Sequence, residues 1–153
     1  MFSMRFRRGA VALLAGCLLI YLGDHLLGIR IELFWGLSTF NPFWFVDVFI
    51  LPLLAGAVVG MIYGLGGKWL AYFPPLIVRF YAYFETLRLI GIPDGAHLMP
   101  MGWWGFFVIL VVESAAIGGV LGEILIKRTY GRGAVHLDFQ QRSKAQKESG
   151  NDA

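Results

Sequence analysis

Two ionisable residues, Arg79 and Glu113, occur in the middle of long apolar stretches of this sequence. A charge in a lipid bilayer costs about 2.5 to 3.5 kcal/mol to insert, so each of these residues needs a partner or a path to water. Counting about 1.5 Å per residue along each stretch puts both at a similar depth. We therefore predict an ion pair. Glu113 then either carries a proton or fixes two helices together, and the permanent charge of Arg79 favours the fixed pair.

A second set of charges is expected about 7 to 12 Å from the midplane, in the outer half of the apolar stretches. Its members are Asp24, Asp47, Glu85 and Arg88. Glu85 and Arg88 are three residues apart and can pair on one helix. The set predicts either a water-filled outer vestibule or interfacial charges that reach the lipid headgroups.

Metal binding and covalent catalysis find little support in the sequence. His25, Asp94 and His97 fall on the outer side, but their spacing is not that of a known ligand set. Ser114 directly follows Glu113, yet successive helix residues point about 100° apart, so these two do not form a nucleophile with its base. We expect no metal, no cofactor and no catalytic residue, and hence no enzyme.

The composition indicates a protein whose solvent is lipid. Hydrophobic residues make up 58% of the 153 residues and charged residues only 15%, whereas soluble domains are about 45 to 50% apolar. The formal net charge of +3 comes mainly from Lys and Arg near the ends of apolar stretches. It therefore reports membrane orientation, not a nucleic-acid partner. The expected partners are the lipid bilayer and either a second copy of the chain or other membrane subunits.

Four apolar stretches predict an all-α integral membrane protein, a four-helix transmembrane bundle with short loops. The stretches cover residues 9–29, 43–64, 69–92 and 101–126, each close to the about 20 residues that a span requires. With their loops they form a membrane domain of residues 1–132. Residues 133–153 are polar and lack apolar periodicity, which predicts a disordered cytoplasmic tail.

The start of the third helix has two alternatives. Pro74 and Pro75 fit the first turn of a helix better than its interior, so this helix begins either near residue 69 or only at the prolines. In the second case Arg79 moves toward the inner face. Glu123 then replaces Glu113 as its expected partner.

Cys17 also allows two readings. It follows Leu14-Ala15-Gly16, a context that resembles the processing site of a bacterial lipoprotein. The apolar run continues for five residues beyond the cysteine, whereas the apolar core of a signal peptide should end near its cleavage point. This continuation favours an uncleaved first helix.

Basic residues gather on one side of the predicted bundle. That side carries Arg5, Arg7, Arg8, Lys68, Lys127, Arg128 and Arg132, against Arg30 and Arg88 on or near the other. Cytoplasmic segments of membrane proteins are rich in Lys and Arg. We therefore expect both termini in the cytoplasm and the protein in the bacterial inner membrane.

Small residues recur every four positions on the second and fourth predicted helices. These residues are Gly56, Gly60 and Gly64, and Ser114, Gly118 and Gly122. Such stripes let helix backbones approach closely in a membrane, which predicts contact between the two helices. They also suit docking to other subunits, so we expect a small accessory or structural subunit of an inner-membrane assembly. The alternative is a small dimeric proton-coupled transporter that uses Glu113 and Arg79.

Overall fold

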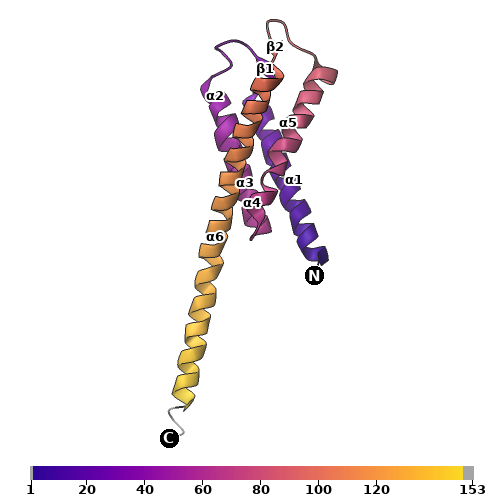
Figure 1. Ribbon diagram of the computed structural model, residues 1–153. Coiled ribbons are helices and arrows are strands. Elements are labelled where there is room, and N and C mark those ends of the chain that lie inside the picture. Colours follow the sequence, from indigo (N-terminus) through magenta and orange to yellow (C-terminus); the bar gives the residue numbers. More distant parts are fainter. Residues whose placement is uncertain (1, 150–153) are drawn as a thin grey trace. The chain divides into compact units, whose positions relative to one another are not determined.

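The protein, as a computed structural model, is built from helices with one pair of short strands (Figure 1). The structure describes the backbone of residues 2–149 and the side chains of residues 5–88 and 91–129. The chain divides into two compact units, Met1–Glu123 and Ile124–Ala153. The first unit contains every functional element discussed below.

The first half of the chain forms two long helical segments. Helix α1 spans Phe2–Leu27. After a loop, α2 (Pro42–Phe45), the π-helix η1 (Val46–Ile50) and α3 (Leu51–Tyr63) follow one another directly. The wide turn of η1 lies immediately before Pro52, which cannot donate a backbone hydrogen bond to the preceding turn. The π-helical turn therefore accommodates the backbone hydrogen bond that Pro52 cannot make.

The third helical segment is interrupted near its beginning. A short helix α4 (Gly67–Leu70) comes first, and α5 (Phe73–Glu85) continues into the π-helix η2 (Thr86–Ile90). Pro74 and Pro75 occupy the first turn of α5, where the missing N–H groups have no helical acceptor to lose. The main helix thus begins at the later of the two positions considered, not near residue 69.

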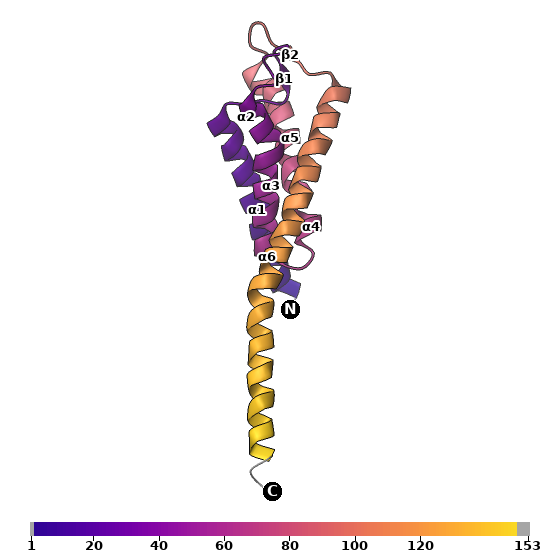
Figure 2. The ribbon, with the colours of Figure 1, turned by 90° about the vertical axis from the view of Figure 1, so that its left-hand side faces the viewer.

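Two short strands join the loops at one end of the first unit. Strand β1 (Leu33–Phe34) pairs antiparallel with β2 (His97–Leu98). Next to them, the Met99 backbone N–H donates a hydrogen bond of 2.9 Å to the Glu32 carbonyl oxygen. We call this the strand end of the unit, and the opposite end, with the start of α1 and helix α4, the amino-terminal end (Figures 1 and 2).

Helix α6 is longer than predicted. It spans Met101–Ser149, so the backbone of residues 133–149 is helical where the sequence predicts a disordered tail. Residues 150–153 of that tail lie outside the described residues. A helix already nucleated by its apolar part extends cheaply through good helix formers such as Ala, Gln, Lys and Glu.

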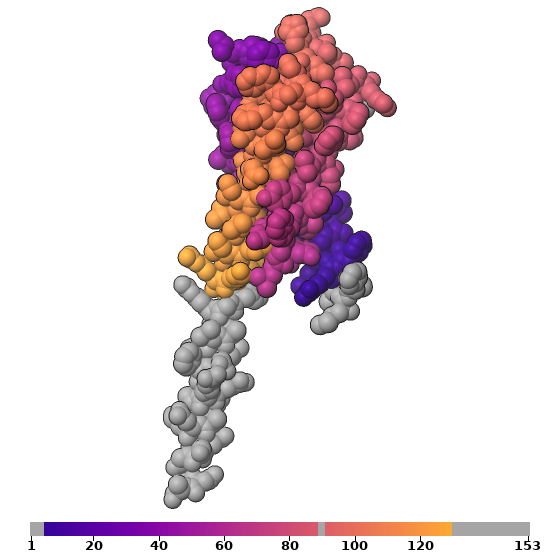
Figure 3. All heavy atoms as spheres, in the orientation of Figure 1, coloured from indigo at the N-terminus to yellow at the C-terminus, as the bar shows by residue number. Residues whose placement is uncertain are grey.

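Within the part of the chain that the structure describes, three helices are long and apolar enough to cross a membrane. They cover Arg5–Leu27, Pro42–Tyr63 and Met101–Thr129. Their outward surfaces carry large apolar side chains, such as Leu18, Leu54 and Ile109, each at least half exposed (one face of the surface is shown in Figure 3). Contiguous apolar surface of this kind fits a membrane protein whose outside faces lipid.

Helices α3 and α6 approach each other backbone to backbone. A methyl group added at Gly118 would collide with the Leu53 carbonyl oxygen of α3, and one added at Gly122 with the Ala57 carbonyl oxygen. From the other side, Gly56 and Gly60 meet carbonyl oxygens of α6, those of Ala115 and Gly119. Ser114 is buried nearby and its hydroxyl donates to the Leu110 carbonyl oxygen at 2.8 Å. The small residues therefore form the contact between α3 and α6 inside the first unit.

Gly64 is the one member of the predicted stripes with a different role. It ends α3 with a φ of +82°, and no atom lies within 4 Å of the position where its Cβ would be. A positive φ favours glycine because it lacks a Cβ. Gly64 therefore terminates the helix instead of contacting α6.

Candidate functional site

Arg79 is completely buried and is shared by three carboxylates. Its Nη2 atom donates hydrogen bonds to Asp24 Oδ1 at 2.8 Å and to Asp47 Oδ2 at 3.3 Å. Its Nη1 atom lies 3.7 Å from Glu32 Oε1. We call these four residues the Arg79 cluster.

Four separate segments meet in the Arg79 cluster. Arg79 comes from the middle of α5, Asp24 from the last turns of α1, and Asp47 from η1. Glu32 belongs to the loop before β1, and the hydrogen bond between Met99 N–H and the Glu32 carbonyl oxygen holds that loop in place. The cluster thus ties three helical segments and the strand end to one guanidinium group.

The cluster contains more carboxylates than it has positive charges. If all of its groups were ionised, two negative charges would remain in a buried site, which is costly unless a proton or another cation compensates them. Polar atoms also remain without hydrogen-bond partners among the described residues, namely Glu32 Oε1, Asp47 Oδ1 and Arg79 Nε. Burial raises the pKa of the Glu32 carboxyl above its ordinary value, and the opposing charge of Arg79 does not cancel this effect.

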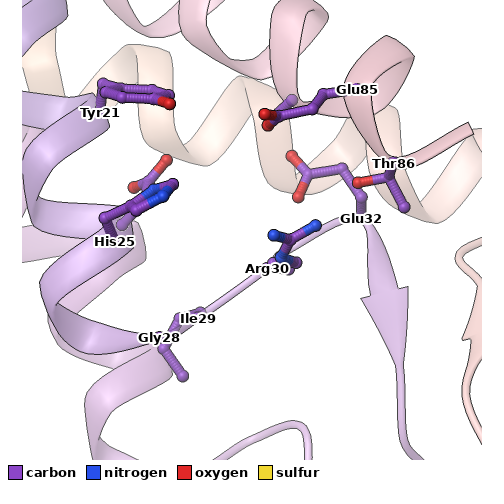
Figure 4. A pocket seen from close by; sticks show the side chains of 10 residues that line it. Tyr21, His25, Gly28, Ile29, Arg30, Glu32, Glu85 and Thr86 are labelled. Atoms are coloured by element: carbon purple, nitrogen blue, oxygen red, sulfur yellow. The ribbon is translucent and has the colours of Figure 1, made fainter. Parts of the chain in front are cut away.

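A cavity of about 120 Å³ opens beside the cluster at the strand end. Tyr21 and His25 of α1 line one side, and Glu85 and Thr86 of the third helical segment line the other, with Glu32 and Arg30 below (Figure 4). Asp24 and Glu32 line the cavity and also contact Arg79. Two members of the Arg79 cluster therefore line this cavity, while Arg79 and Asp47 are fully buried behind them.

The predicted outer set of charges comes together in part. Asp24 and Asp47 share Arg79, and Glu85 lines the cavity with Asp24. Arg88 is exposed and its guanidinium carbon lies 6.0 Å from the ring centre of Phe84. Arg88 therefore does not supply the positive charge of the site.

The structure replaces the predicted Arg79–Glu113 pair with the Arg79 cluster. Glu113 is exposed on α6, and no ion pair joins it to Arg79 among the described side chains. The face of α5 that meets α6 is aromatic, since Phe80 and Tyr83 pack on Trp104 with ring centres 5.6 and 4.9 Å apart. Arg79 instead turns toward α1 and η1. The depth of a residue along a helix can be counted from the sequence. Which neighbouring segment its side chain faces cannot.

Glu123, the other predicted partner, forms a helix cap. Its Oε1 atom accepts hydrogen bonds of 2.9 Å from the backbone N–H groups of Gly66 and Lys68. These N–H groups belong to the start of α4, where they have no acceptor within the helix. Glu123 thus holds α4 against α6 and has no role in the Arg79 cluster.

This cap predicts a measurable loss of stability. Replacing Glu123 by Ala should lower the free energy of unfolding in detergent by about 1 to 3 kcal/mol, because two backbone donors lose a charged acceptor. Chemical denaturation followed by circular dichroism measures the change. Replacing the exposed Glu113 by Ala on the same helix is the matched control and should change it by less than about 0.5 kcal/mol. Equal losses for both variants would contradict the capping role.

Glu32 is the site residue that sequence reasoning missed. It lies between the first two predicted helices, outside the apolar stretches in which charged residues stand out. Its neighbours Ile31 and Leu33 are both buried, and this apolar setting is the one signal in the sequence that could have singled it out.

The described residues contain no group of three His, Cys, Asp or Glu side chains arranged to hold a metal ion. His25 lines the cavity, whereas Asp94 and His97 are exposed elsewhere at the strand end. No protein-family model, curated protein or solved structure matches this chain. Its function is therefore argued from the geometry of the Arg79 cluster and its cavity.

Proposed function

We propose that this chain is a small proton-coupled transporter of the bacterial inner membrane, with Asp24 as the residue that takes up the proton. One observation carries the proposal. A single buried arginine is shared by three carboxylates, and two of these, Asp24 and Glu32, line a cavity that opens at the strand end. Intramembrane ionisable residues of this kind mark proton and ion pathways in membrane proteins.

Asp24 is the member of the cluster best placed to exchange a proton. Its side chain is 12% exposed and lines the cavity, while the side chains of Asp47 and Glu32 are at most 1% exposed. Protonation of one carboxylate would lower the excess negative charge around Arg79, and its release would restore that excess. In this proposal Asp24 takes the proton-carrying role that Glu113 has in the alternative interpretation of the sequence.

The proposal includes a topology of four crossings with both termini in the cytoplasm. The fourth crossing is the segment of α5 and η2, residues 73–90, which at about 1.5 Å per residue is about 27 Å long, close to the hydrocarbon thickness. It carries Arg79, Glu85 and Arg88, and the carboxylates around Arg79 offset the cost of burying its charge. Arg5, Arg7, Arg8 and Lys68 belong to the amino-terminal end, which supports a cytoplasmic location for that end.

The test is proton flux into liposomes that contain the purified protein and a trapped pH-sensitive dye. We expect an imposed pH gradient to drive uptake through the wild-type protein and at least a tenfold slower rate for Asp24→Asn, which keeps the shape of the side chain but cannot exchange a proton. Glu113→Gln is the matched control and should behave as wild type. Infrared spectra should show a carboxylic-acid band that disappears in Asp24→Asn. Equal flux for wild type and Asp24→Asn, or no flux in either, would overturn the proposal.

The accessory-subunit role is a second candidate, and a different observation supports it. A largely apolar groove of about 240 Å³ has Lys68, Trp69 and Tyr72 on one side and Ala116, Ile117 and Val120 of α6 on the other. Small and aromatic residues of this kind are favourable contacts for a helix of another subunit. Purification in mild detergent tests this role. A lone monomer without any co-purifying chain would rule it out.

A further inference from the structure

A larger cavity lies at the amino-terminal end, and none of its described lining residues belongs to the Arg79 cluster. It has a volume of about 580 Å³, within the range of small-molecule sites in proteins. Five residues of α1 line it, together with one residue each from the ends of α3 and α4. These are Arg5, Phe6, Gly9, Ala10, Leu13, Tyr63 and Leu70. We call this cavity the α1 groove.

We propose that the α1 groove binds an anionic phospholipid, with its phosphate diester at Arg5 and an acyl chain along the apolar lining. Basic pockets between membrane helices are sites at which anionic lipid headgroups bind. The proposal does not depend on proton transport, because the groove shares no residue with the Arg79 cluster or its cavity.

Small residues create the space in the groove. Gly9 and Ala10 present little or no side chain along this part of α1, and the position for a Cβ at Gly9 is already 3.4 Å from the Tyr63 ring. Larger apolar residues, Phe6, Leu13 and Leu70, surround this space. An acyl chain can therefore lie against an almost wholly apolar surface, as it does in the bilayer.

Charge complementarity identifies the polar part of the ligand. Among the described side chains, Arg5 is the one charged residue of the lining, and none of the described carboxylates lines the groove. Its planar guanidinium group matches two oxygen atoms of a phosphate. Tyr63 adds a hydroxyl group that can donate a hydrogen bond.

The two parts of the lining together distinguish a phospholipid from simpler ligands. Free phosphate would gain nothing from Phe6, Leu13 or Leu70, and a neutral lipid would gain little from Arg5. Arg5 begins the apolar segment Arg5–Leu27 that is long enough to cross a membrane. In a membrane-spanning α1, Arg5 would therefore lie near the headgroups and Leu13 among the acyl chains.

The experiment measures phospholipid binding to the full chain, purified and delipidated in detergent, by native mass spectrometry. We expect one phosphatidylglycerol molecule to bind the wild-type protein at least tenfold more tightly than it binds Arg5→Gln. Arg7→Gln is the matched control, because it removes the same charge from the same turn of α1 but Arg7 does not line the groove. This control should bind phosphatidylglycerol as the wild type does.

A second variant tests the apolar part of the site. Ala10→Trp should fill the groove and abolish binding of phosphatidylglycerol while Arg5 remains, and an unchanged melting temperature without lipid shows that the variant is folded. Inorganic phosphate in excess should not displace the lipid. The proposal is overturned if Arg5→Gln and Arg7→Gln lose affinity equally, which would indicate diffuse attraction, or if phosphate alone competes, which would indicate a simple anion site.

Discussion

Replacing Arg79 by Met should lower the free energy of unfolding by about 3 to 5 kcal/mol. The substitution leaves three carboxylates together in a buried site, and removal of one partner from a buried ion pair is costly because the remaining charge loses its compensation. Methionine has a similar length and fills the space of the arginine stem, so the loss reports charge rather than a cavity. Denaturation of the purified protein in detergent measures the change.

The pH dependence of this loss has a defined sign. A carboxyl group whose pKa is raised in the folded protein stabilises that state at low pH, and this contribution disappears as the pH rises through the raised value. The pKa of Glu32 is raised already in the presence of Arg79, and loss of the guanidinium should raise it further. The deficit of Arg79→Met should therefore be smallest in acid and grow toward neutral pH. Arg88→Met, an exposed arginine of the same segment, should show neither effect.

Alanine substitutions at two glycines of α6 should have opposite effects on stability. Gly118→Ala should destabilise the protein by about 1 to 3 kcal/mol, since its methyl group collides with the carbonyl oxygen of Leu53 and the helices α3 and α6 must separate. Gly105→Ala should stabilise it by about 0.5 to 1 kcal/mol, because no atom lies within 4 Å of the new Cβ and alanine favours a helix. Melting temperatures in one detergent compare the two variants. A stabilising Gly118→Ala would show that α3 and α6 do not pack closely.

The sequence predicts where the helices lie along the chain better than it predicts which of their side chains meet. The lengths of the apolar stretches predict α1, α3 and α6, and the glycine spacing predicts the contact between α3 and α6. Both features can be read within a single helix, because they depend only on its length and period. The first turn of α5 at Pro74 was one of two predicted alternatives, since proline restricts the backbone locally. The helical backbone of residues 133–149 was not predicted, because a polar segment without an apolar face carries no periodic signal.

The partners of Arg79 could be predicted only in part. Asp24 and Asp47 stand out in the sequence because they are charged within apolar stretches, and both contact Arg79. Glu113 stands out for the same reason but is exposed. A single sequence does not indicate whether the guanidinium group of Arg79 faces α6 or faces α1 and η1. Glu32 reaches the site through the pairing of loops at the strand end, which are more than 60 residues apart in the chain. Long-range pairing of this kind leaves no local pattern.

The order of residues in the Arg79 cluster matters during biosynthesis. Asp24, Glu32 and Asp47 all precede Arg79 in the chain, and a ribosome adds about 5 to 20 residues per second. When the arginine emerges, every one of its acidic partners has therefore been synthesised for seconds. In the proposed topology of four crossings, the arginine never enters the bilayer before its counter-ions exist. A nascent chain halted before α5 would contain the three carboxylates without the guanidinium group that compensates their charge.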